Sequence, residues 1–227
     1  MTNTAKKSQK MASAYSLDSR YKEYLEKQRV DLKKAINVKK HCRINIDPSK
    51  FTQLAKKHQP TKKWHHPRPF LSKQANMQME LNNRIGYNEH NSMEWNWGIK
   101  PEHNSKLQKL VGKKNFVKIG IAPDKVLVRL LLYTPGQQLP LHQDGYEGFA
   151  SMFKVKGKVK RFFVAVSDWD WGHALQVHDK MITKWQTGDT YYIPAGVFHT
   201  SANFGIAPKY TLTITGVTNG VALRNKQ

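Results

Sequence analysis

Short apolar runs separated by turn residues fill the second half of this chain. Residues 126–133 form a nearly continuous apolar run, residues 162–166 form another, and residues 209–215 alternate polar with apolar side chains. Such runs are typical of strands buried on one or both faces. Turn residues recur about every eight to twelve positions, as in a barrel or sandwich of short strands. We therefore predict a mainly β fold with flanking helices (α+β), built as a double-stranded β-helix, or jelly roll.

The segment His142-Gln143-Asp144 follows one of these runs. Side chains two residues apart on a strand point to the same side, so His142 and Asp144 are expected to share one metal ion. A further imidazole, His199, would complete two histidines and one carboxylate, the facial arrangement of non-haem Fe(II) oxygenases. Zinc or another divalent ion, and a jelly roll that has lost its metal, remain alternatives at this stage.

Lys209 lies ten residues after His199, on the alternating strand. An ammonium in that place would pair with the far carboxylate of an organic acid whose near end chelates the metal. The spacing of these residues therefore predicts a binding site for a dicarboxylate beside the metal.

Together these motifs resemble the Fe(II)/2-oxoglutarate-dependent oxygenase superfamily. The segment His199-Thr200-Ser201-Ala202-Asn203-Phe204, followed by Pro208-Lys209, resembles the distal motif of its prolyl and aspartyl/asparaginyl hydroxylase branches. The similarity covers roughly residues 125 to 218 and does not extend to the first 115 residues. Lys209 stands where arginine is commoner in these branches, so its contact with the far carboxylate of the organic acid would be monodentate.

The resemblance implies a cupin-like fold, Fe(II), dioxygen and 2-oxoglutarate as co-substrate, with ascorbate as an accessory reductant. It implies oxidative decarboxylation of 2-oxoglutarate to succinate, coupled to hydroxylation of a substrate. Lys209 would bind the C5 carboxylate of 2-oxoglutarate, with Tyr133 and Thr211 as further contacts. The implied iron ligands are His142, Asp144 and His199.

Substrate contacts are expected from Arg161, at the start of a buried strand, and from Trp169, in a turn rich in aromatic residues. The branch resemblance favours a prolyl or other protein residue as substrate, while nucleic acid and a free amino acid or metabolite stay open. A non-enzymatic, cupin-like binding module is the alternative from a different class of function. Several acidic and histidine side chains near Trp169 are interpreted as residues that stabilise turns, not as metal ligands: Asp168, Asp170, His173 and His178.

The chain carries 38 Lys and Arg against 16 Asp and Glu, a formal net charge of +22. Residues 1–115 hold 25 basic and 9 acidic side chains, a net of +16, so the excess is concentrated there. Such a charge attracts polyanions, and nucleic acid is a candidate partner, although solubility alone would also explain it. We expect residues 116–227 to form the catalytic jelly roll and residues 1–115 a basic, helical or irregular extension that packs on it.

Cys42 is the single cysteine, so no intramolecular disulfide can form. No apolar run reaches the length of a signal peptide or a membrane span. We therefore expect a cytoplasmic protein without a membrane partner. Residues 16–40 predict an amphipathic helix, and residues 42–46 a short strand before a helix that starts near Asp47.

Overall fold

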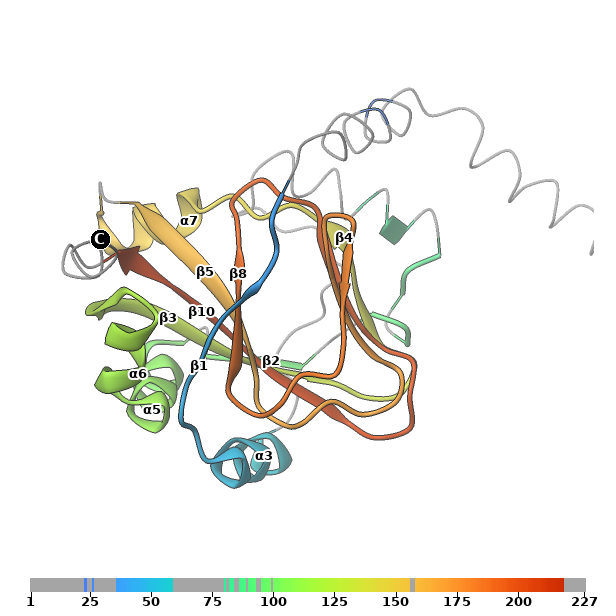
Figure 1. Cartoon of the computed structure of the whole chain (residues 1–227), viewed down its shortest axis with the longest axis horizontal. Coiled ribbons are helices and arrows are strands. Elements are labelled where there is room, and N and C mark those ends of the chain that lie inside the picture. Colours follow the sequence, from blue (N-terminus) through green and yellow to red (C-terminus); the bar gives the residue numbers. More distant parts are fainter. Residues whose placement is uncertain are drawn as a thin grey trace, which may run out of the picture.

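The computed structural model describes residues 36–58, 100–155 and 158–218, together with 23, 26, 80, 82–83, 86–88, 90–92 and 95–98. Within these residues two antiparallel sheets pack against each other (Figure 1). The strands are β1 (Lys40–Arg43), β2 (Trp95–Trp97), β3 (Ile121–Tyr133), β4 (Gln138–His142), β5 (Val159–Ala165), β6 (His173–Val177), β7 (Lys180–Ile182), β8 (Asp189–Ile193), β9 (His199–Asn203) and β10 (Lys209–Thr218). The helices whose bounds the structure defines are α3 (Pro48–Lys57), α5 (Pro101–Val111), α6 (Lys113–Lys118) and α7 (Glu147–Phe153).

The strand order confirms the predicted double-stranded β-helix. The larger sheet has the order β1-β8-β5-β10-β3-β2, and the smaller sheet has the order β4-β9-β6-β7. From β3 to β10 the chain passes repeatedly from one sheet to the other, except at the β6–β7 hairpin, which stays in the smaller sheet. The protein is mainly β with a few helices, as the density of short strands predicts.

Helices α3, α5 and α6 cover the outer face of the larger sheet (Figure 1). Because side chains alternate along a strand, each strand of this sheet divides its residues between two cores. On β3, Val128 and Leu130 pack against the helices, whereas Leu131 and Tyr133 belong to a cluster inside the barrel. This alternation decides which residues reach the interior.

Asn104 on α5 extends the hydrogen bonding of β3 beyond the end of β2. Its side-chain amide donates to Val126 O at 3.1 Å, and its carbonyl accepts from Val128 N at 2.8 Å. The buried amide thus takes the place of a neighbouring strand at an edge that would otherwise be open.

Strands from the predicted extension join the larger sheet. β1 pairs with β8, and β2 pairs with β3, while Asp47 caps α3 by accepting a hydrogen bond from Ser49 N. The strand predicted at residues 42–46 is confirmed only in part: β1 is Lys40–Arg43, and residues 44–46 are not in a strand. The division of the chain at residue 115 stays a prediction.

The helix predicted at residues 16–40 lies mostly outside the described residues, but its predicted end is wrong, because Lys40 begins β1. The adjacent His65 and His66, which the sequence favours as loop residues because neighbouring side chains on a strand point to opposite sides, lie outside the described residues. No helix in the described part of the chain has the length and apolar character needed to cross a membrane.

Candidate metal centre

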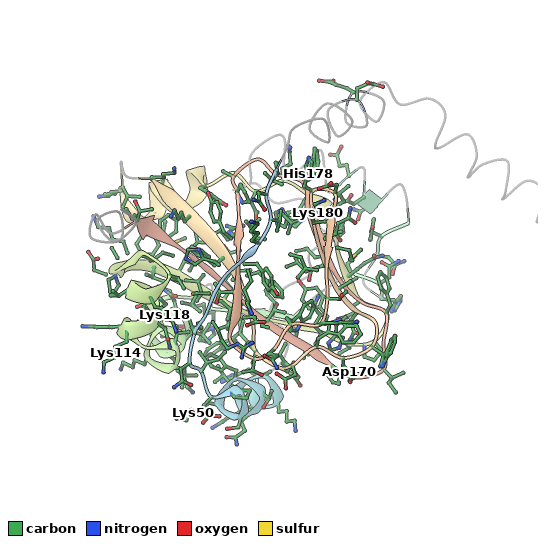
Figure 2. The ribbon with its side chains drawn as sticks, in the orientation of Figure 1. Lys50, Lys114, Lys118, Asp170, His178 and Lys180 are labelled. Carbon is green, nitrogen blue, oxygen red and sulfur yellow. The ribbon has the colours of Figure 1, made fainter. Side chains whose placement is uncertain are left out.

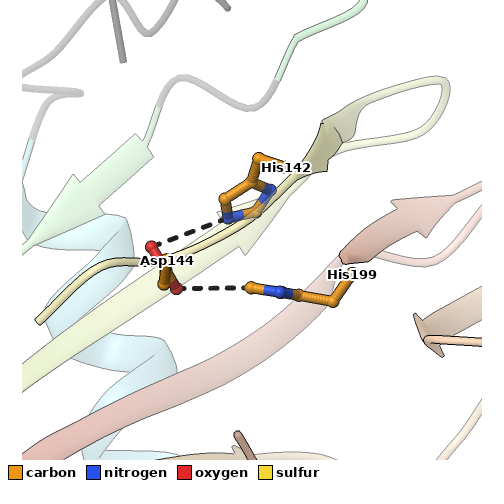
Figure 3. Close-up of side chains that lie close together, drawn as sticks. All are labelled: His142, Asp144 and His199. Carbon is orange, nitrogen blue, oxygen red and sulfur yellow. Dashed lines mark ion pairs between the residues drawn. The ribbon is translucent and has the colours of Figure 1, made fainter. Parts of the chain in front are cut away.

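His142, Asp144 and His199 converge in the smaller sheet (Figure 3). His142 is the last residue of β4 and pairs with His199, the first residue of β9, so the two rings lie 4.2 Å apart between centroids. Asp144 follows just after β4 ends, not on the strand as the sequence pattern suggested. Their ligand atoms all lie within 4.8 Å of one another, with His199 Nε2 3.3 Å and His142 Nε2 3.9 Å from Asp144 oxygens.

Backbone carbonyls orient both imidazoles. His142 Nδ1 lies 2.8 Å from Pro140 O, and His199 Nδ1 lies 2.9 Å from Val197 O. Since a carbonyl oxygen accepts only, each Nδ1 carries the proton, and each Nε2 presents a lone pair toward Asp144. This tautomer is the one that a metal ligand needs.

Burial keeps both rings neutral. It holds the pKa of His142 well below its usual value, with a further contribution from His199, and lowers the pKa of His199 to about 4. Neutral imidazoles and a carboxylate are the ligand forms that bind divalent metals. The donor set therefore fits a metal ion with two nitrogen ligands and one oxygen ligand.

An open cavity with an empty volume of about 590 Å³, including the space at its mouth, adjoins the three residues. Side chains from both sheets line it: Arg129, Leu131, Tyr133, Leu139, His142, Asp144, Arg161, Phe163, Leu175, Ile193, His199, Ser201 and Thr213.

Arg161, predicted to contact substrate, does line this cavity. Its Nη1 forms an ion pair with Asp144 Oδ2, and its Nε donates to Thr215 Oγ1 at 2.9 Å. Only 13% of its side chain is exposed. The guanidinium therefore shares the Asp144 carboxylate with His199, which lies 3.3 Å from the same oxygen.

Lys209 is buried behind the lining of the cavity, with 1% of its surface exposed. Its ammonium donates to Ser201 Oγ at 2.6 Å and to Ala202 O at 3.0 Å, and it also donates to Ala174 O. It lies 4.7 Å from the centre of the Tyr133 ring. Burial holds the pKa of Lys209 well below its usual value.

The two other residues expected to bind 2-oxoglutarate lie close to Lys209. Tyr133 pairs with Lys209 across β3 and β10, lines the cavity, and forms a side-chain hydrogen bond with Ser201. Burial raises the pKa of Tyr133, so its hydroxyl stays protonated. Thr211 is fully buried, and its Oγ1 has no hydrogen-bond partner among the described residues.

Trp169 is not among the residues that line the cavity. Its Nε1 donates to His173 O at 2.6 Å, and its ring packs against the core inside the barrel. The nearby carboxylates act as turn residues, as expected: Asp168 accepts from Thr187 N, and Asp170 accepts from Trp171 N.

Arg129 and Ser201 are among the cavity residues that the sequence did not single out as site residues. Arg129 is the one charged residue in the apolar run 126–133, two and four positions before Leu131 and Tyr133. Its place on the inner face of β3 follows from that spacing. Ser201 stands two residues after His199 and likewise shares its face, but serine is too common for this spacing to single it out.

No protein-family model and no curated protein sequence matches the chain. Among solved structures it is similar to a predicted oxalate decarboxylase from Thermotoga maritima, at 15% identity and a TM-score of 0.31, over 48% of this chain and 76% of that one. A cupin 2 conserved barrel domain protein from Salinispora arenicola is 12% identical, with a TM-score of 0.29, over 43% and 66% of the two chains. A conserved protein with a double-stranded β-helix domain from Klebsiella pneumoniae is 15% identical, with a TM-score of 0.30, over 41% and 69%.

These likenesses cover less than half of the chain and concern the fold alone. The strand order shows a double-stranded β-helix protein. Its smaller sheet carries a His-Asp-His cluster that could bind a metal ion.

Proposed function

We propose that the protein is an Fe(II)- and 2-oxoglutarate-dependent dioxygenase that hydroxylates its substrate. The observation that carries this proposal is the convergence of His142, Asp144 and His199, with both Nε2 atoms directed to the carboxylate. Three protein ligands leave coordination positions for a co-substrate and for dioxygen. Bound Fe(II), 2-oxoglutarate and dioxygen would supply the oxidising chemistry, and ascorbate would serve as an accessory reductant.

The protein's own residues would hold and orient the reactants. Lys209 offers a buried ammonium whose three hydrogen-bond partners are all neutral oxygens. A carboxylate would compensate this charge better than they do, because a charge-assisted hydrogen bond is about twice as strong as a neutral one. The hydroxyls of Tyr133 and Ser201 lie beside the ammonium and would complete the cradle for the C5 carboxylate of 2-oxoglutarate.

The substrate class follows less directly. The distal motif favours a prolyl or other protein residue, whereas the two arginines in the cavity favour a free amino acid or another small acid. Within the described residues, the positions of the exposed lysines do not favour nucleic acid. Exposed lysines on the helices, such as Lys50, Lys114 and Lys118 (Figure 2), lie behind the larger sheet, whereas the cavity opens between the two sheets.

Turnover of the co-substrate tests the proposal. Succinate release should require both Fe(II) and 2-oxoglutarate, and Asp144→Ala should abolish it. Asp179→Ala is the matched control, because this carboxylate also contacts a histidine, His178, at 2.9 Å but is half exposed and lies outside the cluster. Succinate release that persists in Asp144→Ala, or without added metal after chelation, would refute the assignment and favour a binding module.

A further inference from the structure

We infer that the substrate presents an oxyanion, a carboxylate or a phosphate, to a pair of arginines in the cavity wall, Arg129 and Arg161. The inference rests on the proposed function, because it names the chemical class of the substrate for that same site. Arg161 contacts Asp144, and both arginines line the cavity apart from the ammonium proposed to bind the co-substrate.

Strand register places the two guanidinium groups on the same wall. β10 lies between β3 and β5 in the larger sheet, and Arg129 pairs with Thr213 while Arg161 pairs with Thr215. All four residues therefore occupy neighbouring positions on the inner face. Lys209 stands four residues before Thr213 on β10, about 13 Å along the strand at 3.3 Å per residue.

The hydrogen bonding of Arg129 is incomplete. Its Nε is buried and has no hydrogen-bond partner among the described residues, and no acidic side chain there forms an ion pair with it. A guanidinium has five N–H donors, and a buried donor without an acceptor costs free energy. Packing alone does not explain an arginine in this apolar strand, whereas an anionic ligand would supply the missing acceptor.

Charge counting supports the same conclusion. Among the lining residues, Arg129 and Arg161 contribute +2 and Asp144 contributes −1. A divalent metal and a 2-oxoglutarate dianion cancel each other, so the wall keeps a net charge of +1. The two guanidinium groups line the same cavity wall, so their like charges repel each other. A bound oxyanion would relieve this repulsion.

A role for Arg161 in orienting Asp144 is compatible with this inference but does not replace it. That ion pair uses Nη1 of Arg161 and does not account for the buried Arg129 Nε, which has no hydrogen-bond partner among the described residues. A metal ion would also compete for the Asp144 carboxylate, since His199 Nε2 lies 3.3 Å from the oxygen that Arg161 contacts. Metal binding would thus weaken the Arg161–Asp144 ion pair and leave more guanidinium N–H donors for the substrate.

Binding measured without turnover tests the inference. Protein loaded with Mn(II) and saturating 2-oxoglutarate, kept anaerobic, is titrated calorimetrically with free amino acids and with nucleoside monophosphates. In the matched probes, the corresponding amino-acid amides and nucleosides, a neutral group replaces the oxyanion, and we call these probes the neutral counterparts. Because a hydrogen bond to a charged group contributes about 1.5–3 kcal/mol, at least one acid should bind roughly 10- to 150-fold more tightly than its neutral counterpart. The series that does so, carboxylates or phosphates, identifies the source of the oxyanion.

Variants assign the effect to the arginines. Arg129→Gln should bring the acid and its neutral counterpart to within about twofold, and Arg129→Lys should keep part of the preference through its charge. Lys160→Gln is the matched control, because it removes one positive charge beside Arg161 from a residue that does not line the cavity. Thermal melting without ligands should show Arg129→Gln at least as stable as the wild type, since it loses an unsatisfied guanidinium.

The inference is overturned if no acid in either series binds better than its neutral counterpart, or if Arg129→Gln keeps the preference. It is also overturned if Arg129→Gln abolishes 2-oxoglutarate binding while Lys209→Met retains it, because the arginines would then hold the co-substrate. Failure of the proposed function gives a different result: 2-oxoglutarate would not bind the Mn(II)-loaded wild type at all. The acid probes can still be titrated into that protein.

Discussion

Replacing Lys209 by methionine removes the buried ammonium while keeping a side chain of similar length. In the wild type this ammonium has 1% exposure and donates to three neutral oxygens, including Ser201 Oγ at 2.6 Å. The proposed partner is the C5 carboxylate of 2-oxoglutarate, and one charge-assisted hydrogen bond contributes about 1.5–3 kcal/mol. Lys209→Met should therefore weaken 2-oxoglutarate binding roughly 10- to 150-fold.

Isothermal titration of Mn(II)-loaded, anaerobic protein with 2-oxoglutarate measures this change. Lys118→Met is the matched control, because Lys118 is exposed on α6, on the outer face of the larger sheet. The control should bind like the wild type. If Lys209→Met also binds within twofold of the wild type, the buried ammonium does not anchor the co-substrate, and this part of the account is refuted.

The pH dependence provides a second test of the same contact. Burial holds the pKa of Lys209 well below its usual value. The protonated form pairs with the dianion, so 2-oxoglutarate affinity should fall as the pH rises through the lowered pKa, and this fall should be absent from Lys209→Met. Without ligand, pH affects stability in the opposite direction. The unfolded chain binds the Lys209 proton more tightly than the folded chain does, so the free energy of unfolding rises with pH between the lowered pKa of Lys209 and its usual value.

The remaining predictions concern the metal-free protein and the fold. The pKa of His199 is lowered to about 4 by burial, so between pH 6.5 and 4 the unfolded chain takes up a proton that the folded chain does not. The free energy of unfolding should fall across that window by on the order of 3 kcal/mol, and urea denaturation that is flat from pH 7.5 to 4.5 would contradict this. Gly98→Ala should destabilise by about 1–3 kcal/mol or more, because φ is +118° and a Cβ would lie 2.2 Å from Val128 O. Gly136→Ala, with positive φ but open space, should cost less in the same thermal melts. Asn104→Ala should cost about 1–3 kcal/mol by leaving Val128 N–H unpaired, and faster amide exchange at Val128 would report the loss directly.

The core strands could be predicted from the sequence because burial imposes a simple alternation on them. The run 126–133 predicts β3, and the polar stripe at Lys209 and Thr211 predicts a strand with a polar inner face. The metal cluster could also be predicted, because the residue types and their spacing are specific to few arrangements. Asp144 reaches the cluster from beyond the end of β4, so the three predicted residues do converge, although Asp144 does not lie on the strand.

Other features depend on contacts between distant segments. β1 is recognisable as a short strand, but its place beside β8, 146 residues away at the Arg43–Asp189 hydrogen bond, has no local signal. The helical cover was equally hard to predict, because α5 owes its position to one buried amide, Asn104, and to an apolar face of few residues. Arg129 looks like an exception to an apolar run until the register with Thr213 places it in the cavity wall.

The most direct test of the central claim is ligand-linked stabilisation of the wild type in four thermal melts: apo, with Mn(II), with 2-oxoglutarate, and with both. A ligand that binds only the folded state raises the melting temperature. If His142, Asp144 and His199 hold a metal that the co-substrate chelates, 2-oxoglutarate should raise the melting temperature only when Mn(II) is present, and Asp144→Ala should lose this effect. Stabilisation by 2-oxoglutarate that is equal with and without metal, or none in either case, would contradict the account.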